Sequence, residues 1–184
     1  MKSKTFKSEN TGSCCSASRN SISHKTIKNI TSSSSNSVLP TDNMSLVKGG
    51  GFLMGTDYEH GFTNDGEGPI REVHVNDFYM GRTAVTNSQF AKFVNATGYR
   101  TESEKFGWSF VFYSFVKPCN RPEAYQSPPG TPWWKKVDGS SWKHPEGPGS
   151  DLRERMNHPV VHITWNDATT YCNWSGKRLS LIHI

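Results

Sequence analysis

The chain has 184 residues, enough for one domain and a tail, and its hydrophobic content of 33% is below the usual share of a globular domain. Residues 1–40 carry six basic residues and one acidic residue, whereas the remainder is neutral, so the net charge of +5 does not predict a nucleic-acid-binding face. No apolar run approaches the ~20 residues of a membrane-spanning helix, and we therefore expect neither a nucleic acid nor a membrane as partner.

The N-terminal segment, residues 1–45, predicts a disordered leader. It is rich in Ser, Asn, Thr and Lys, and it cannot bury enough apolar surface to offset the entropy of ordering. Its start is basic but leads into polar residues, which argues against a secretory signal. The adjacent Cys14 and Cys15 could form a metal or redox site, but two thiols in a flexible leader are the simpler interpretation. Four cysteines make no disulfide framework at this length, so a reducing, cytoplasmic setting is expected.

The ordered part is expected to begin with short strands and a helix. Order starts near Val47, and strands are predicted at residues 52–54, 71–75 and 78–80. Thr86 has the spacing of a capping box with Gln89, and Gly98 is suited to end the helix that follows.

The second half of the chain predicts few regular elements. Residues 106–115 are aromatic-rich and read as extended, residues 119–132 as a Pro-rich connector, and residues 133–151 as a shaped loop. Residues 160–163 are β-branched and predict a short buried strand. A last helix is expected from Thr164, with Asp167 at its third position, to Gly176.

Five of the six tryptophans lie between Trp133 and Trp174, among Pro and Gly residues, which predicts a rigid, loop-rich core. The region from Val47 to Leu179 resembles the formylglycine-generating enzyme family, the sulfatase-modifying factors. The most specific segments are Met54-Gly55-Thr56-Asp57, Val85-Thr86-Asn87, Gly98-Tyr99, Ser109-Phe110-Val111-Phe112, Pro132-Trp133-Trp134, Trp142-Lys143-His144-Pro145-Glu146-Gly147-Pro148, His158-Pro159-Val160-Val161-His162 and Gly176-Lys177-Arg178-Leu179.

The resemblance implies an irregular α+β fold similar to C-type lectins, with short strands, two or more helices and long loops, over residues 46–179. It implies an oxidoreductase that converts a cysteine in a Cys-x-Pro-x-Arg segment of an unfolded sulfatase-type polypeptide to formylglycine. O2 is the oxidant in that family, copper(I) held by two thiolates activates it, and calcium is also bound. Soft thiolates select Cu(I), so this ligand choice is chemically sound.

The family's cysteine pair and calcium-binding segments are expected beyond the end of this chain, which is expected to be an incomplete, inactive and poorly folded fragment. Residues 180–184 depart from the family's Pro-Thr-Glu continuation and are expected to be a non-native tail. Cys172 matches a structural helix cysteine, and Cys119 matches nothing. We therefore assign no catalytic residue and no metal ligand in the chain.

The resemblance also implies that some residues of this chain line part of a groove that binds the substrate. Ser109 and Trp133 match groove positions, and Ser103 stands where the family has a small residue. Core packing is the alternative role for Trp133, and a local hydrogen bond the alternative for Ser109. Trp108 stands where other members can carry Asp, so the peptide preference is expected to differ.

His158 and His162 are four residues apart, a spacing at which two histidines can bind one metal ion. In a strand, however, they would lie about 13 Å apart, too far for one ion, so both are expected to be structural or surface residues, as is His144.

Two other functions remain open from the sequence. One is an iron-dependent enzyme that joins sulfur to histidine derivatives and shares the fold, but its His-x-x-x-His-x-Glu motif is missing here. The other is a lectin-like binding module without catalysis.

Overall fold

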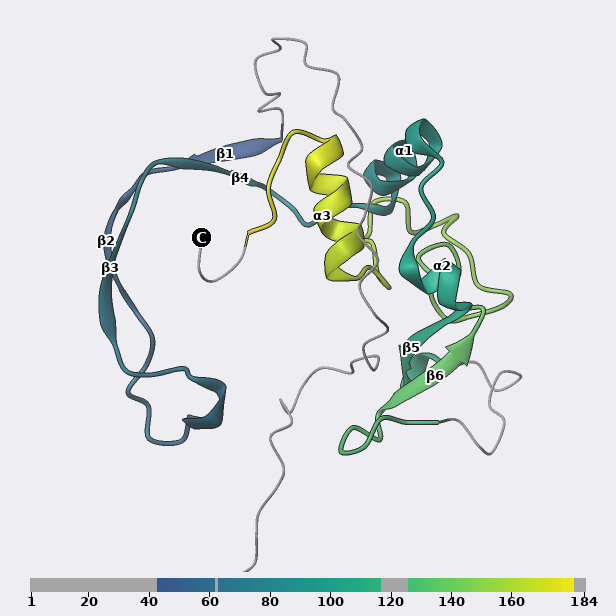
Figure 1. Cartoon of the computed structure of the whole chain (residues 1–184), viewed down its shortest axis with the longest axis horizontal. Helices are drawn as coiled ribbons and strands as arrows, with labels where there is room; N and C mark the ends of the chain where they lie inside the picture. The colour runs from purple at the N-terminus through teal and green to yellow at the C-terminus, as the bar shows by residue number, and fades with distance from the viewer. Residues whose placement is uncertain (1–42, 62, 117–125, 181–184) are drawn as a thin grey trace, which may run out of the picture.

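The computed structural model describes residues 43–61, 63–116 and 126–180. The elements that it contains are β1 (Met44–Val47), β2 (Gly50–Met54), the 3-10 helix η1 (Thr63–Asp65), β3 (Arg71–Val75), β4 (Phe78–Gly81), α1 (Asn87–Thr97), α2 (Glu102–Phe106), β5 (Trp108–Phe112), the 3-10 helix η2 (Tyr113–Phe115), β6 (Trp134–Asp138) and α3 (Trp165–Trp174). Short strands, helices and long connections give the α+β architecture expected from the sequence (Figure 1). Among the described residues, no helix combines the length and the apolar character needed to cross a bilayer.

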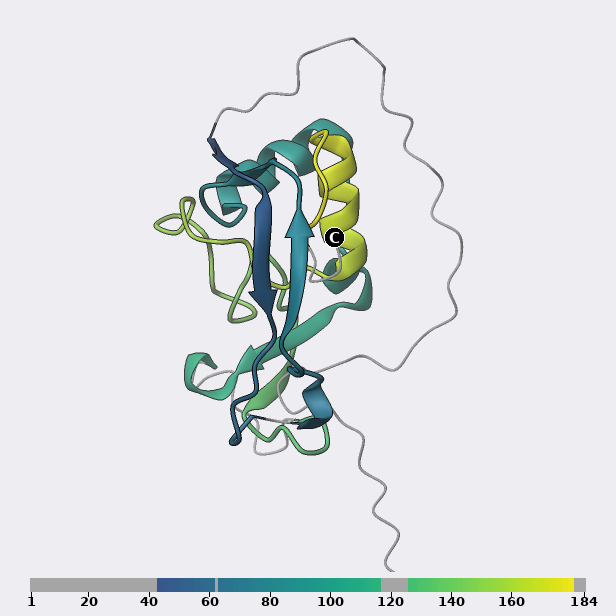
Figure 2. The ribbon, with the colours of Figure 1, turned by 90° about the vertical axis from the view of Figure 1, so that its left-hand side faces the viewer.

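The N-terminal strands form a long two-stranded arm. β1 pairs antiparallel with β4, and β2 pairs antiparallel with β3. The arm curves away from the helices in Figure 1 and runs in front of them in Figure 2. Where one strand pair passes into the other, Asp77 accepts hydrogen bonds from the Gly49 N–H and the Lys48 ammonium, both at 2.8 Å. A side chain at Gly49 would collide with the backbone of Val75 and Asn76, so this junction requires glycine.

The larger hydrophobic core lies between α1 and α3. Its buried members are aromatic: Phe90, Phe93, Trp142 and Tyr171. Phe93 is fully buried, and its ring centroid lies 5.2–5.6 Å from the rings of Tyr99, Tyr171, Trp174 and Phe90. The helices therefore meet through an aromatic cluster that also holds one tryptophan from the loop after β6.

Local sequence signals fix the ends of these helices as predicted. Thr86 and Gln89 form a complete capping box at the start of α1, and Gly98 ends the helix in the left-handed conformation at φ 65°. Thr164 and Asp167 form the corresponding box on α3, which ends at Trp174, and Gly176 follows at φ 64°. Both predictions are confirmed.

A second ribbon, formed by β5 and β6, carries a smaller core. Ser109 lies opposite Val137, and Phe112 lies opposite Trp134. Val111, Val116 and Val137 are the buried members of this core. The same antiparallel pair appears below the helices in Figure 1.

Of the predictions for the second half, the extended segment at residues 106–115 is confirmed in part, as β5, whereas the loop at residues 133–151 and the strand at residues 160–163 were wrong in part or in whole. Residues 102–106 form α2 and Gly107 turns the chain at φ 77°, so the extended segment starts only at Trp108. Residues 134–138 form β6 because β5 supplies a partner. Residues 160–163 form no strand: Val160 makes one ladder-type bond to Val85, and His162 adopts φ 58°.

β1 begins at Met44, three residues before Val47, where the sequence predicted the first ordered residues. Cys14, Cys15, Cys119 and most of the expected leader lie outside the described residues.

Candidate functional site

Trp133 lies at the surface, at the end of the β5–β6 ribbon. It directly precedes β6, and its carbonyl accepts a hydrogen bond from the Tyr113 N–H at 2.8 Å, which extends the pairing by one step beyond the strands. Trp133 is 37% exposed, and Tyr113, its hydrogen-bonded partner, and Phe115 are more exposed still. This end of the ribbon therefore presents aromatic side chains to solvent.

Ser109 lies on the same ribbon but is buried. Its hydroxyl oxygen is 2.9 Å from Nδ1 of His162, and its carbonyl accepts a hydrogen bond from the Ser140 hydroxyl at 3.1 Å. The strand register places Ser109 four residues from Tyr113, the residue bonded to Trp133. At ~3.3 Å per residue this separation is about 13 Å along the ribbon.

Ser103 lies in α2 and is fully buried. Its hydroxyl is 3.1 Å from the Thr101 hydroxyl, and its carbonyl accepts a hydrogen bond from the Gly107 N–H at the end of the helix. The structure thus brings Ser109 and Trp133 onto one ribbon and places Ser103 behind it, in the helix that leads into β5.

One face of the ribbon carries a row of aromatic side chains, which begins in the aromatic-rich segment at residues 106–115. Trp108, Phe110 and Phe112 alternate along β5 and so point to one side. The Trp108 and Phe110 rings lie 5.1 Å apart, the Phe112 and Trp134 rings lie 5.8 Å apart, and the Lys136 ammonium lies 5.1 Å from the Trp108 ring centroid. The alternation of aromatic residues was the signal available in the sequence, but only strand pairing could show that Trp134 and Lys136 join it.

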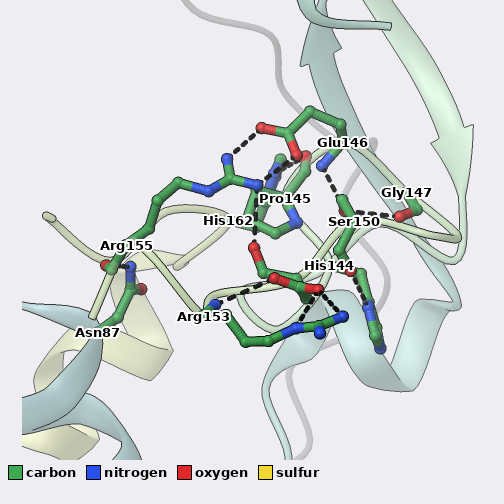
Figure 3. Close-up of polar contacts among 10 residues, drawn as sticks. Asn87, His144, Pro145, Glu146, Gly147, Ser150, Arg153, Arg155 and His162 are labelled. Atoms are coloured by element: carbon green, nitrogen blue, oxygen red, sulfur yellow. Dashed lines mark hydrogen bonds and ion pairs between the residues drawn. The ribbon is translucent and has the colours of Figure 1, made fainter. Parts of the chain in front are cut away.

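The loop after β6 is held by charged and polar contacts (Figure 3). Arg155 donates two hydrogen bonds to the carboxylate of Glu146 and one to the Asp151 carbonyl, the last at 2.9 Å. Hydrogen bonding to Glu146 raises the pKa of Arg155. Asn87, the first residue of α1, donates to the Arg155 carbonyl at 2.7 Å and so fastens the loop to the helix.

The histidines have structural partners or lie at the surface. His144 Nδ1 is 2.7 Å from the Ser150 carbonyl, so this nitrogen donates, within the loop. His162 contacts two groups through its two ring nitrogens, Ser109 through Nδ1 and the Pro145 carbonyl through Nε2 at 2.7 Å. His158 is exposed. The strand from which we inferred their separation is absent, so that argument no longer applies.

The described residues do not fit the copper or calcium sites that the resemblance implies. In this part of the chain, no group of three or more His, Cys, Asp or Glu side chains could hold a metal ion. Cys172 is the one cysteine described, and burial raises the pKa of its free thiol, which disfavours the thiolate that copper needs. We therefore derive no step through either metal.

Glu104 links α2 to the loop after β6 and should make stability depend on pH. Burial alone would raise its pKa, but hydrogen bonds from the Thr101 N–H and hydroxyl, with the Lys143 ammonium 3.2 Å away, leave the pKa below its ordinary value. A depressed pKa in the folded state contributes stability above the unfolded value near 4.5, and this stability is lost as the pH falls.

We therefore expect Glu104→Gln to lower the free energy of unfolding by about 1 kcal/mol at pH 7, with the difference from the original chain vanishing toward pH 3. Urea unfolding at a series of pH values measures this, with Glu154→Gln at an exposed position as control. A pH-independent difference would contradict the assignment.

Comparison with known proteins identifies the family. The family described as "Sulfatase-modifying factor enzyme 1-like domain" matches residues 30–181. The chain is 52% identical to the formylglycine-generating enzyme of Thermomonospora curvata over 74% of this chain and 45% of that protein. It is 50% identical to the Mus musculus formylglycine-generating enzyme over 72% and 36% of the two chains.

A third relative is the Bos taurus protein named inactive C-alpha-formylglycine-generating enzyme 2, with 50% identity over 76% of this chain and 46% of that protein. The chain therefore spans less than half the length of these relatives. It belongs to the sulfatase-modifying factor, or formylglycine-generating enzyme, family.

Proposed function

We propose that the protein acts in the conversion of a cysteine to formylglycine, in a Cys-x-Pro-x-Arg segment of an unfolded sulfatase-type polypeptide, with O2 as the oxidant. Family membership and about half-identical relatives named for this activity support the proposal. Because the chain spans less than half of the length of those relatives, we propose the oxidation for the whole protein. For the described residues we propose only that they help to bind the peptide.

The observation that carries this assignment is the placement of Trp133 and Ser109 on one ribbon. Trp133 offers an exposed aromatic ring, and Ser109 lies about 13 Å away along the strands. One extended peptide lying along the strands could therefore contact both residues, through peptide positions that are a few residues apart. A flat indole packs well against a proline ring, so we place the peptide's proline near Trp133.

The two serines take different parts in the proposed groove. Ser109 keeps 7% of its surface exposed, against 0% for Ser103, and we assign its hydroxyl to a backbone group of the peptide. Ser103 is covered, so we assign it to the wall behind the groove, where a small side chain lets α2 lie close to β5. Copper(I) and calcium would be bound by residues outside those described, and the cytoplasmic setting expected from the cysteine usage and the polar N-terminal segment is kept as a proposal.

Trp133→Ala is expected to weaken binding of a fluorescent Cys-x-Pro-x-Arg peptide about tenfold, because one aromatic contact with proline is worth roughly 1–1.5 kcal/mol. Fluorescence anisotropy with the whole chain measures this. Trp165→Ala is the matched control, since Trp165 is a more exposed tryptophan on α3. The proposal predicts unchanged binding for the control and weaker binding of a peptide with alanine in place of proline. Equal binding by the Trp133 and Trp165 variants would refute it.

A non-catalytic binding module is the second candidate function, and the relative named inactive favours it. The two candidate functions differ in whether the bound peptide is oxidised to an aldehyde. Mass spectrometry of the bound peptide, after incubation of the whole protein rather than this chain alone in air with Cu(I), would detect an aldehyde in place of the thiol only if the protein is an oxidase. Saturable binding without aldehyde would support the binding module.

A further inference from the structure

His162 has an unusual backbone conformation for its residue type. Its φ of 58° lies in the left-handed region, which non-glycine residues rarely adopt and which carries a cost in free energy. The neighbouring Val161 is 44% exposed, whereas His162 itself is half-buried. The polar ring of His162 therefore lies inward, two residues before Thr164, the N-cap of α3. The backbone does not continue the strand that the sequence predicted.

The ring lies between two segments that are far apart in the sequence. Nε2 lies 2.7 Å from the Pro145 carbonyl oxygen in the loop after β6, as the close-up of this loop shows (Figure 3), and Nδ1 lies 2.9 Å from the Ser109 hydroxyl in β5. His162 therefore joins the ribbon, the loop and the start of α3 through one side chain.

The contact with the Pro145 carbonyl determines which nitrogen carries the proton in the neutral ring. A carbonyl oxygen can only accept, so Nε2 must carry the proton that is donated to Pro145. In the neutral imidazole Nδ1 then has a lone pair, and it accepts the hydroxyl proton of Ser109. With its proton donated to His162, the Ser109 oxygen can only accept any further hydrogen bond.

We propose that His162 is a positioning residue that makes Ser109 an acceptor for a backbone N–H of the bound peptide. An extended peptide presents N–H groups along its length, so an oxygen with its proton directed away selects the amide side of the peptide over its carbonyls. The inference rests on the proposed function, because it assumes a peptide on the β5–β6 ribbon. It goes further by naming the peptide group that Ser109 binds, a backbone N–H, and the residue that makes Ser109 an acceptor, His162.

Two replacements of His162 separate its two contacts. Asparagine tolerates the left-handed backbone and places an amide oxygen where Nδ1 lies, so His162→Asn keeps an acceptor for Ser109. Glutamine carries its amide one atom further out, so His162→Gln can still reach Pro145 but has no polar atom at the Nδ1 position. A merely structural role predicts that the loss of the Pro145 contact matters most, and hence that the asparagine variant is the more damaged.

The test measures the Kd of the Cys-x-Pro-x-Arg peptide for the original chain, His162→Asn, His162→Gln, Ser109→Ala and the double variant that combines His162→Gln with Ser109→Ala. Thermal unfolding is the check on folding. We expect His162→Gln and Ser109→Ala each to weaken binding about fivefold to tenfold, the value of one hydrogen bond. His162→Asn should stay within about threefold of the original chain, and the double variant should bind as Ser109→Ala does.

Peptides methylated at single backbone nitrogens identify the donor. One of them should bind the original chain about fivefold to tenfold more weakly yet lose nothing further against Ser109→Ala. Equal binding of all methylated peptides, or an undiminished effect of His162→Gln in the Ser109→Ala background, would overturn the inference while leaving the proposed function intact. Failure of the original chain to bind the unmodified peptide would overturn both.

Discussion

Replacing Asp167 with asparagine is expected to lower the free energy of unfolding by about 3–4 kcal/mol. Asp167 is fully buried, and its carboxylate accepts hydrogen bonds from the Tyr99 hydroxyl at 2.9 Å, the Glu102 N–H at 3.1 Å and the Thr164 N–H at 3.0 Å. The Thr164 hydroxyl adds a fourth bond. One side chain thus joins the end of α1, the start of α2 and the cap of α3.

An asparagine fits this site poorly because its NH2 group would face donors in place of an oxygen. At least one buried donor would lose its partner, and each such loss costs about 1–3 kcal/mol. Small domains are stable by only ~5–15 kcal/mol, so the variant should unfold at a much lower urea concentration. Burial and the nearby charge of Asp167 also raise the pKa of Tyr99, as expected for a phenol that donates to a carboxylate.

Two controls separate this junction from general effects of removing a carboxylate. Tyr99→Phe removes one of the four bonds and should cost about 1–2 kcal/mol, whereas Asp151→Asn, at an exposed site where the carboxylate pairs with Arg153, should change the stability much less. Urea unfolding followed by circular dichroism gives all three values. An Asp167 variant as stable as the Asp151 variant would show that the junction contributes nothing.

Phe93→Ala is expected to cost about 3–5 kcal/mol, the usual range for a phenylalanine removed from a packed core. Phe93 is fully buried and contacts the rings of Tyr99, Tyr171 and Trp174, so its removal leaves a cavity between α1 and α3. The same unfolding experiment measures this, and near-ultraviolet circular dichroism should show weakened aromatic signals.

Phe115→Ala is the matched control, because Phe115 is 64% exposed and its loss opens no cavity. Its expected cost is under about 1 kcal/mol. If the two alanine variants unfolded together, the aromatic cluster between α1 and α3 would not be the main core of the folded chain.

The parts of the fold that the sequence predicted correctly depend on residues close together in the chain. The capping boxes at Thr86 and Thr164 each involve a partner three residues away, and Gly98 ends its helix by its own conformational freedom. The strands at residues 71–75 and 78–80 were visible for the same reason, from their local pattern of side chains.

Two of the features that were missed depend on partners distant in sequence. Lys135 and Lys136 give residues 134–138 no apolar alternation, and only pairing with β5 makes them a strand. The β-branched run at residues 160–163 favoured a strand by propensity, but His162, which donates to the Pro145 carbonyl and accepts from the Ser109 hydroxyl, adopts another backbone conformation. Tertiary contacts outweighed local preference in both places.

In the candidate site, too, the local features could be predicted from the sequence and the contacts between distant residues could not. Trp133 and Ser109 could be chosen by resemblance, but neither the burial of Ser109 nor its pairing with His162 could be read from the sequence. The aromatic row on β5 and β6 also needed the strand register before its members could be grouped.

Photo-crosslinking is the most direct test of the central claim, which is that the β5–β6 ribbon binds an extended Cys-x-Pro-x-Arg peptide. A peptide with a photoreactive group at the residue next to its proline would be irradiated with the whole chain, and the attached residues identified by mass spectrometry. The account predicts attachment at or beside Trp133, abolished by excess unlabelled peptide. Attachment confined to the β1–β4 arm or to α3, or unaffected by the competitor, would contradict it.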